Sequence, residues 1–450
     1  MTGTIAVIGG GIAGLAAAFE ATRRGAEVTL LEAEEQAGGK LVTSPFAGLQ
    51  VDEGADAFLA RVPWAYELCA ELGLADELVS PAIGSARVWL DDQLWDLPTD
   101  AVLGVPLDPD ALARSGAVSA EAVAAVEADR RRTEPVSTDH GDSVSRFVRD
   151  RLGDEVFERL VGPLLGGINA GDVERLSLAA AVPQFAAVAD EPSLSRALER
   201  QRATVSDPSA PVFYAHPRGM AHIVQVLSDR LRSVVHTGEP VDALEPLGDR
   251  WRIRTRRRCL DADGVIVAVP APSAARLLDP LTGPTPLAAI EHAGVVMATF
   301  AWPTSGVAMS LDTSGFLVPR SAGLLLSAAS ISSSKWAHLG GADQVIVRAS
   351  AGRFGDERAL ALDDEALVAA LLADLDRTMG LVTAPTAVRV VRWPASFPQY
   401  TPGHLDRISE VEQAVHALGG VALAGGALRG VGIPACIRSG RDAAARLLDH

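Results

Sequence analysis

The chain has 450 residues, of which 48% are hydrophobic, so it is long enough for two or three domains with large buried cores. A net charge of -17 and a pI near 5.0 argue against general nucleic-acid binding, and an anionic substrate would need locally placed basic side chains. The three cysteines lie far apart in no CxxC pattern and no secretory signal precedes the first strand, which together predict a cytoplasmic protein with reduced thiols and no metal site.

The N-terminal segment predicts a βαβ unit. Residues 4–8 (TIAVI) form an apolar strand, residues 12–24 a helix with a face of alanines, and residues 26–32 (AEVTLLE) a second strand. Between the first strand and the helix, Gly9-Gly10-Gly11-Ile12-Ala13-Gly14 fits the GxGxxG pattern, and Glu32 ends the second strand. Such a loop lets a pyrophosphate approach the backbone at a helix N-terminus, while the carboxylate accepts bonds from ribose hydroxyls. The motif predicts dinucleotide binding rather than a structural turn, without separating FAD from NAD.

A second glycine pair follows the second strand. Gly38 and Gly39 allow another close backbone approach, and Lys40 adds a cation suited to phosphate. A simple nicotinamide dehydrogenase has no need of glycines at this point, whereas an extended flavin dinucleotide does. We therefore favour a flavin over the alternative of an ordinary turn.

The middle of the chain predicts two inserts of different character. Residues about 95–205 are rich in alanine and charge with helical periodicity, as in 142–161. Residues about 280–385 alternate in the manner of strands and end in a helix at 363–379. Residues 293–311 carry no charge, but a proline and a glycine interrupt them, so we expect a strand, a turn and a strand rather than a membrane span.

Two further segments complete the α/β pattern. Consecutive strands are predicted at 234–245, 250–259 and 263–271. At the C-terminus, an apolar strand from Ala422 leads into a glycine-rich loop and then a helix with Pro434 in its first turn. The amides at this helix N-terminus are suited to stabilise the negative charge that a reduced flavin gains at its N1 and C2 carbonyl edge. The last loop is thus predicted to meet the flavin ring, and the first loop its pyrophosphate.

These motifs, together with the segment DEGADAF (52–58), resemble those of the FAD-dependent amine oxidase-like superfamily. Within that superfamily the chain resembles the porphyrinogen oxidases. One departure is Asn169, where the family pattern leads us to expect tyrosine, so this side chain either lines the pocket or caps a turn. The narrower resemblance covers nearly the whole chain in order and rests on WDLPTDAVLGVP (95–106), LVGPLLGGINAGDVERLSL (160–178), SSSKWAHL (332–339), RWPASFPQYTPGHLDRI (392–408) and GVGIPACIRSG (430–440).

The resemblance implies an α/β fold with α+β inserts. It consists of a Rossmann-like FAD-binding domain of the amine oxidase type, discontinuous in sequence, with a mixed-sheet substrate domain and a helical domain. We place the FAD-binding domain at 1–95, 205–280 and 385–450, the helical domain at 96–204 and the substrate-binding domain at 281–384.

The resemblance also implies which residues contact FAD. Val241 would meet the adenine edge through its backbone, with a plain core valine as the alternative, and Trp393 would pack on the flavin or else belong to the core. The full set is Gly9, Gly10, Gly11, Ile12, Ala13, Gly14, Glu32, Ala33, Gly39, Lys40, Gly54, Ala55, Asp56, Ala57, Val241, Trp393, Val431, Gly432 and Ile433.

The candidates for binding a substrate carboxylate are mostly basic residues. Arg61 is the first choice because it follows the implied flavin contacts closely and a guanidinium suits a carboxylate, although a solvated loop arginine is the alternative. No His–Asp or Cys–His pair points to a dedicated acid or base, so no catalytic residue is assigned. The candidates are Arg61, Asn169, Lys335 and His338, followed by Arg218 and His404. A surface role is favoured individually for Lys335, His338, Arg218 and His404.

The resemblance implies an enzyme of haem biosynthesis that oxidises coproporphyrinogen III to coproporphyrin III. Six electrons would leave by hydride transfer to FAD, with molecular oxygen as acceptor, hydrogen peroxide as product and a transient contact with a ferrochelatase. The acidic chain without a convincing membrane helix favours this water-soluble substrate, with at most peripheral membrane association. Protoporphyrinogen IX is the alternative substrate, and a flavin amine oxidase, a carotenoid-type desaturase or a flavin-binding scaffold are weaker alternatives.

Overall fold

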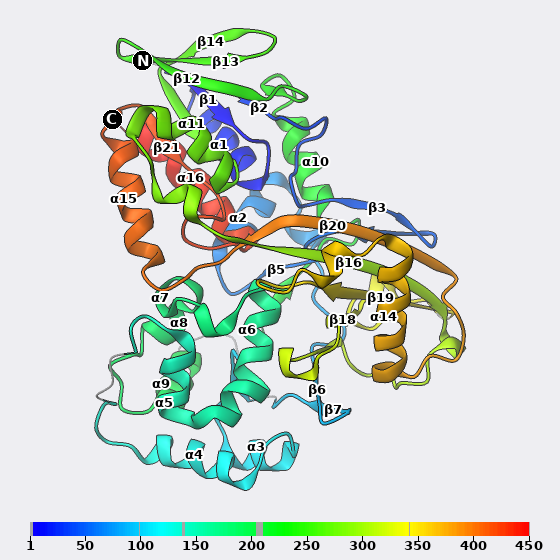
Figure 1. The fold of residues 1–450 in the computed structure, drawn as a ribbon. Helices are drawn as coiled ribbons and strands as arrows, with labels where there is room; N and C mark the ends of the chain where they lie inside the picture. Colours follow the sequence, from blue (N-terminus) through cyan, green and yellow to red (C-terminus); the bar gives the residue numbers. More distant parts are fainter. Residues whose placement is uncertain (1–2, 99, 137–139, 204–209, 342, 450) are drawn as a thin grey trace. The chain divides into compact units, whose positions relative to one another are not determined.

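The computed structural model describes residues 3–98, 100–136, 140–203, 210–341 and 343–449. The chain divides into two compact units, each assembled from separated stretches (Figure 1). Unit 1 comprises Met1–Ser80, Pro211–Ile290 and His404–His450, and unit 2 comprises Pro81–Ala210 and Glu291–Gly403.

These boundaries differ from the predicted domains in several places. Residues 281–290, predicted in the substrate-binding domain, belong to unit 1, and the predicted helical and substrate-binding domains fall in one unit. Residues 81–95 and 385–403, which the sequence places in the FAD-binding domain, belong to unit 2. The reason is that strands β6 (Arg87–Leu90), β7 (Gln93–Asp96) and β20 (Ala387–Pro398) hydrogen-bond into the large sheet of that unit. Hydrophobic pattern alone does not say which of two sheets a short strand joins.

Unit 1 is built on a five-stranded parallel sheet with the order β11-β2-β1-β15-β21. The first and last strands of the unit therefore lie in one sheet, as the two glycine-rich loops predict. Helices α1 (Ile12–Arg23) and α16 (Ile433–Leu448) pack against each other beside it (Figure 1). The strands are β1 (Thr4–Ile8), β2 (Glu27–Leu31), β11 (Val235–His236), β15 (Gly264–Val267) and β21 (Val421–Leu423).

Smaller elements complete unit 1. The three strands predicted after residue 234 form, but they divide between two sheets. The stretch 234–245 contains β11 and the start of β12, 250–259 contains β13, and 263–271 contains β15. Strands β11 and β15 belong to the parallel sheet, whereas β12, β13 and the additional β14 form an antiparallel sheet of that order. The further strands are β3 (Thr43–Phe46), β4 (Leu49–Asp52), β5 (Phe58–Leu59), β10 (Phe213–Tyr214), β12 (Val241–Leu247), β13 (Arg250–Thr255) and β14 (Cys259–Ala262). The further helices are α2 (Pro63–Leu72), α10 (Ala221–Arg230), α11 (Ala271–Thr282) and α15 (His404–His416).

Unit 2 contains a mixed seven-stranded sheet with the order β20-β16-β19-β18-β17-β6-β7. The pairs are antiparallel except for β17 with β6, and helix α14 (Asp364–Met379) covers the sheet with buried leucines. The remaining strands are β16 (His292–Pro303), β17 (Gly315–Leu317), β18 (Leu326–Ile331) and β19 (Gln344–Ala351), with short helices α12 (Ser332–Lys335) and α13 (Arg358–Ala361).

The first half of unit 2 is helical and has a hydrophobic core separate from that of the sheet. The helix predicted within 142–161 forms but is interrupted, because Gly153 adopts a φ of +83°. The elements are β8 (Ala101–Val102), β9 (Val105–Pro106), α3 (Pro109–Ser115), α4 (Ala120–Arg131), α5 (Val144–Val156), a π-helix (Phe157–Val161), α6 (Gly162–Asn169), α7 (Leu178–Ala181), α8 (Pro183–Ala186) and α9 (Leu194–Ala203).

The uncharged window 293–311 forms one strand instead of two. Strand β16 occupies its first part and a 3-10 turn, Thr304–Gly306, follows, but the expected second strand is reduced to a single bridge between Val307 and Leu381. In the described part of the chain, no helix combines the length and the apolarity that crossing a bilayer requires.

Candidate functional site

The first glycine loop of unit 1 is shaped by contacts with its own backbone. A Cβ atom on Gly14 would lie 1.9 Å from the Gly9 carbonyl oxygen, and one on Gly9 would lie 2.5 Å from the Ala268 carbonyl oxygen. Gly9 also has a φ of +104°, a region that other residues rarely adopt. At these two positions glycine is therefore required by the packing of strand, loop and helix.

The same loop opens toward the N-terminus of α1. Gly11 is the N-cap of α1, and among the described residues no side chain caps this helix. A Cβ atom on Gly11 would meet no atom within 4 Å, so space lies in front of its backbone. The first-turn amides of Ile12 and Ala13 have no intrahelical acceptor, and they can bind a phosphate at the positive end of the helix dipole.

Glu32 directly follows β2, beside this loop, one residue beyond the end of the strand. One carboxylate oxygen accepts the Gly10 amide at 2.5 Å, and the other accepts the Glu34 amide at 2.8 Å. A carboxylate has about four acceptor positions, so acceptor capacity remains for ribose hydroxyls. Val241 is buried at the start of β12. The segment before it lies close to Glu32, because the Glu239 amide donates a hydrogen bond to the Glu32 carbonyl at 2.8 Å.

The second glycine pair lies directly against the first loop. The Gly38 amide donates to the Gly10 carbonyl at 2.8 Å, and Gly38 forms a parallel bridge with Gly11. Gly39 has a φ of +59°, and a Cβ atom there would lie 3.3 Å from the Gly11 Cα atom. The two motifs therefore form one backbone surface.

Lys40 extends from this surface toward the other end of the chain. Burial raises the pKa of the Cys436 thiol, in the first turn of α16, to about 11, while the neighbouring Lys40 ammonium lowers it. The N-terminal glycine pair and the start of the last helix are thus close in space. This proximity joins the two predicted ends of the flavin site within unit 1.

Residues Gly54, Ala55, Asp56 and Ala57 connect β4 with β5. The start of this segment is held by the Glu53 amide, which donates to the Val42 carbonyl at 2.8 Å. Asp52, just before it, accepts the Met220 amide at 2.8 Å. The segment thus has a fixed origin in unit 1.

The last glycine loop connects β21 with α16 and is more open than the first. Gly432 is the N-cap of α16, and among the described residues no side chain caps this helix either. A Cβ atom on Gly432 would approach only Pro434 Cδ, at 3.7 Å, and one on Gly425 would meet nothing within 4 Å. The backbone at Val431, Gly432 and Ile433 is therefore accessible to a planar ligand.

A close helix contact fixes the two loops relative to each other. A Cβ atom on Gly440 of α16 would lie 2.0 Å from the Ala13 carbonyl oxygen of α1. The backbones of the first and last helices therefore touch. Strands β1 and β21 flank β15 in the same sheet, so both loops leave the same edge.

His404 supports the last loop and does not lie on the surface. Its side chain is buried, and its Nε2–H donates to the Leu428 carbonyl at 2.9 Å. Burial lowers the pKa of His404, so the ring is neutral near pH 7. The sequence offered this histidine as a carboxylate contact or, more readily, as a surface residue, and the surface interpretation is wrong because the side chain is buried. Contact with a carboxylate stays a prediction.

Two arginine candidates occupy exposed positions in unit 1. Arg61 lies in the turn between β5 and α2, and no ion pair is formed by it within the described residues. Arg218 pairs with Glu77 at 2.8 Å. Arg61 therefore stays a candidate, whereas Arg218 is engaged in a surface ion pair.

In unit 2, two predicted residues lie beside members of the same apolar cluster although 224 positions separate them in the sequence. Asn169 ends α6, and its Nδ2 donates to the Leu165 carbonyl at 3.0 Å, so it caps its own helix. The next residue, Ala170, packs in a small apolar cluster with Val295 and Phe354. Val295 pairs with Trp393 across β16 and β20. Asn169 and Trp393, both half-buried, thus adjoin one apolar cluster whose own members are buried.

Lys335 and His338 lie elsewhere in unit 2. Both flank the buried Trp336, with the Lys335 ammonium 4.9 Å from the Trp336 ring centre. The Ile346 amide donates to the Ser333 hydroxyl at 3.2 Å, which places α12 beside the start of β19. Phe354, which belongs to the cluster beside Asn169, follows the opposite end of β19. The structure does not bring these two candidates together with Asn169.

The donor set of unit 1 fits a flavin dinucleotide. It supplies uncapped helix amides at two glycine loops, a strand-end carboxylate and a lysine, which match phosphate, ribose and a flavin edge that gains negative charge. The sequence motifs predicted the two loops, but not that His404 is buried and bonded to the Leu428 carbonyl of the last loop.

Comparison with known proteins identifies the family. Residues 12–448 match the model of the flavin containing amine oxidoreductase family. The chain is 32% identical to coproporphyrinogen III oxidase of Bacillus subtilis, covering 99% of this chain and 98% of that one. It is 35% identical to coproporphyrinogen III oxidase of Mycobacterium bovis over 96% of this chain and 94% of the relative.

A solved structure agrees along the full length. A crystal structure from Exiguobacterium sp. 255-15, which carries a provisional protoporphyrinogen oxidase name, has a TM-score of 0.88 and 30% identity and covers 100% of both chains. The similarity in sequence and fold therefore extends over the whole length of the chain. The chain belongs to the flavin containing amine oxidoreductase family.

Proposed function

We propose that this protein is an FAD-dependent coproporphyrinogen III oxidase of haem biosynthesis that uses molecular oxygen as acceptor. The observation that carries the proposal is the full-length similarity to two relatives that are named coproporphyrinogen III oxidase. The convergence of the first and last glycine loops in unit 1 supports the choice of a flavin dinucleotide.

The proposed contacts follow from the donors in unit 1. The α1 amides at Gly11, Ile12 and Ala13 would bind the pyrophosphate, and Glu32 would accept the ribose hydroxyls. The backbone near Val241 would meet the adenine, and the α16 N-terminus at Gly432 would face the flavin ring. When bound, FAD would accept two electrons in each of three oxidation steps and return them to oxygen, with hydrogen peroxide as the product.

The protein's own residues would orient the macrocycle instead of supplying an acid or base. We propose that the half-buried Asn169 and Trp393, beside the buried cluster of Ala170, Val295 and Phe354, form the surface of unit 2 that meets the flat apolar ring. Arg61 is a proposed contact for a propionate. The three-domain division of the sequence analysis remains our proposal for how these tasks are distributed.

Coproporphyrinogen III carries four propionates and protoporphyrinogen IX carries two. We propose the first because the relatives' names agree with it and because no described helix could cross a membrane. In this proposal the enzyme works in the cytoplasm and passes its product to a ferrochelatase. Protoporphyrinogen IX is the second candidate, favoured by the name of the Exiguobacterium structure.

The test begins with the purified protein and its colour. We expect a yellow protein whose flavin absorbance near 450 nm bleaches when coproporphyrinogen III is added without oxygen. Aerobic initial rates of porphyrin fluorescence should be higher with coproporphyrinogen III than with protoporphyrinogen IX. Bleaching only by an amine, or by no substrate, would refute the proposal, and faster oxidation of protoporphyrinogen IX would reverse the substrate choice.

A further inference from the structure

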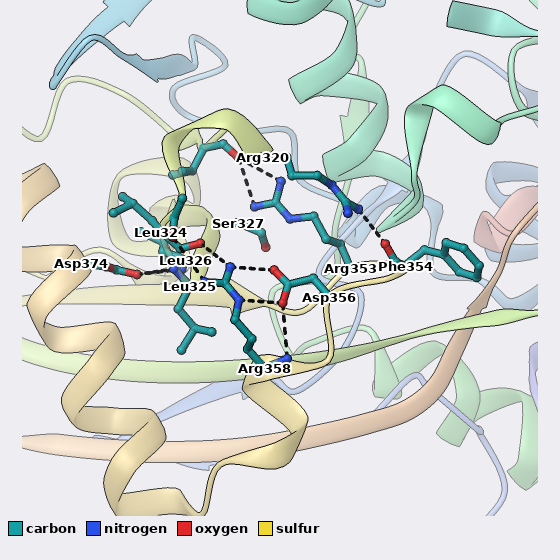
Figure 2. Close-up of polar contacts among 12 residues, drawn as sticks. Arg320, Leu324, Leu325, Leu326, Ser327, Arg353, Phe354, Asp356, Arg358 and Asp374 are labelled. Carbon is teal, nitrogen blue, oxygen red and sulfur yellow. Dashed lines mark hydrogen bonds and ion pairs between the residues drawn. The ribbon is translucent and has the colours of Figure 1, made fainter.

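Three arginines of unit 2 gather where two loops meet beyond the end of β19 (Figure 2). Arg353 follows β19, Arg358 begins α13, and Arg320 lies in the turn after β17. Arg358 is neutralised by Asp356, because its Nε and Nη2 atoms contact the two carboxylate oxygens of Asp356 at 2.8 Å each. The nearest carboxylate is therefore already committed to one arginine.

Arg353 and Arg320 have only carbonyl partners. Both terminal nitrogens of Arg353 reach the single Val318 carbonyl at 3.3 Å, and Arg320 Nη2 donates to the Phe354 carbonyl at 2.6 Å. Neither forms an ion pair with a carboxylate among the residues that the structure describes. Figure 2 shows the two guanidinium groups side by side. The Asp356 carboxylate acts on Arg353 electrostatically, but its direct bonds go to Arg358. Two adjacent arginines therefore have no carboxylate within bonding distance, and an added anion would give them a direct partner.

The environment of Arg353 makes this lack unfavourable. Burial, together with the neighbouring Arg320, lowers the pKa of Arg353 to about 10. A guanidinium has five donors, and two long bonds to one carbonyl leave several unused. A carboxylate that bound both arginines would supply charge and bidentate acceptors together.

The pair adjoins the surface proposed for the tetrapyrrole ring. Phe354 is next to Arg353 in the chain, and its amide donates to the Ala170 carbonyl at 2.7 Å. Its side chain packs with Ala170 and Val295. On the other side, a Cβ atom on Gly167 of α6 would lie 3.0 Å from a methyl group of Leu317, the neighbour of the residue that Arg353 contacts. A ring on this surface would have the two cations at its edge.

We propose that Arg353, assisted by Arg320, binds a propionate carboxylate of the substrate. This inference rests on the proposed function for the identity of the ligand. Arg358 is outside the site because Asp356 satisfies it. The lone Arg61 lies in unit 1, so this pair is a separate carboxylate contact on the unit that carries the apolar surface.

The test measures equilibrium binding of coproporphyrin III, the stable oxidised product, to the flavin-loaded protein by porphyrin fluorescence. Arg353→Gln should weaken binding roughly 10- to 100-fold, because a charged hydrogen-bonded pair is lost. Arg353→Lys, which keeps the charge, should recover part of the loss. The matched control Arg377→Gln removes an exposed arginine of α14 that pairs with Asp92, and its affinity should stay within about twofold of the wild type.

The ligand supplies a second control. The tetramethyl ester of coproporphyrin III has no carboxylates, so wild type and Arg353→Gln should bind it equally within about twofold. Equal affinity of both proteins for the free acid, or an equal loss for acid and ester, would overturn the inference. If Arg353→Gln loses flavin or melts several degrees lower, the test uses Arg320→Gln in its place. If Arg320→Gln then weakens coproporphyrin III binding by less than about threefold, the inference is overturned.

The same experiment separates this inference from the proposed function. If the wild-type enzyme does not oxidise coproporphyrinogen III but Arg353→Gln selectively loses coproporphyrin III, the proposed reaction is wrong and the carboxylate site stands. If oxidation proceeds and the variant binds the porphyrin normally, the reaction stands and the site is wrong.

Discussion

The first and last glycine loops of unit 1 look alike in sequence and differ in why they contain glycine. In the first loop, Cβ atoms at Gly14 and Gly9 would collide with carbonyl oxygens at 1.9 and 2.5 Å. In the last loop, a Cβ atom at Gly432 has its nearest neighbour at 3.7 Å and one at Gly425 has none within 4 Å. Glycine in the first loop is required by the protein itself, whereas the space at the last loop is available to a ligand.

This difference separates stability from cofactor binding. A methyl group added where the backbone packs tightly destabilises the fold whether or not a ligand is bound. A side chain added in open space leaves the fold intact and competes only with the ligand. The two loops therefore predict opposite outcomes for similar substitutions.

The largest effect is expected from Gly14→Ala. Its methyl group cannot fit against the Gly9 carbonyl, and we expect the free energy of unfolding to fall by about 3 kcal/mol, with loss of bound flavin. Gly11→Ala is the matched control in the same loop, because its methyl group meets no protein atom within 4 Å. It should change stability by less than about 1 kcal/mol and weaken flavin binding roughly tenfold.

Chemical denaturation of the flavin-free proteins and flavin titration measure both quantities. Equal destabilisation by Gly14→Ala and Gly11→Ala would show that the first loop is not divided into a packed part and an open part.

The next effect concerns the last loop. Gly432 has a φ of -67°, which any residue adopts, so Gly432→Leu should change the unfolding free energy of the flavin-free protein by less than about 1 kcal/mol. Flavin affinity, or the rate of flavin bleaching by substrate, should nevertheless fall at least about tenfold, because the side chain occupies the space at the α16 N-terminus. Destabilisation as large as that of Gly14→Ala would erase the difference between the loops.

The sequence predicted this part of the molecule well because the physical cause is local. GxGxxG, the strand-end glutamate and the glycines before Pro434 each encode a turn and a helix start within a few residues, and β1, α1, β21 and α16 form where they were expected. Their meeting in one sheet follows from the order of a parallel α/β fold.

Long-range features could not be predicted in the same way. The sequence does not reveal that His404 is buried and bonded to the last loop, or that Asp356 bonds directly to Arg358 and not to Arg353. Strand β20 was assigned to the flavin domain because nothing in its pattern distinguishes one sheet from another. Such features depend on which side chains the tertiary structure brings together.

A smaller effect should appear in the pH dependence of the last loop. Burial and the neighbouring Arg407 and Arg429 lower the pKa of His404 below its ordinary value of about 6.5. The unfolded chain therefore binds a proton more readily, so the stability contributed by the neutral ring is present above pH 6.5 and is lost as the pH falls through the folded pKa. The slope from this one group is at most about 1.4 kcal/mol per pH unit.

The variant His404→Gln isolates this contribution. Glutamine can still donate to the Leu428 carbonyl but does not titrate, so its unfolding free energy should vary less than that of the wild type between pH 7 and pH 5. Parallel pH profiles for the two proteins would mean that His404 does not couple the last loop to pH.

The smallest effect is expected at the rim of the last loop, where Arg429 pairs with Glu412 at 2.7 Å. The Arg429 side chain is 48% exposed, and exposed ion pairs contribute about 0–1 kcal/mol. Arg429→Gln should therefore lower the unfolding free energy by less than about 1 kcal/mol, and by still less in 1 M salt, with flavin affinity unchanged within about twofold. A tenfold loss of flavin affinity would instead place the guanidinium among the flavin contacts. The last loop would then bind flavin partly through charge, and not only through its backbone amides and open space.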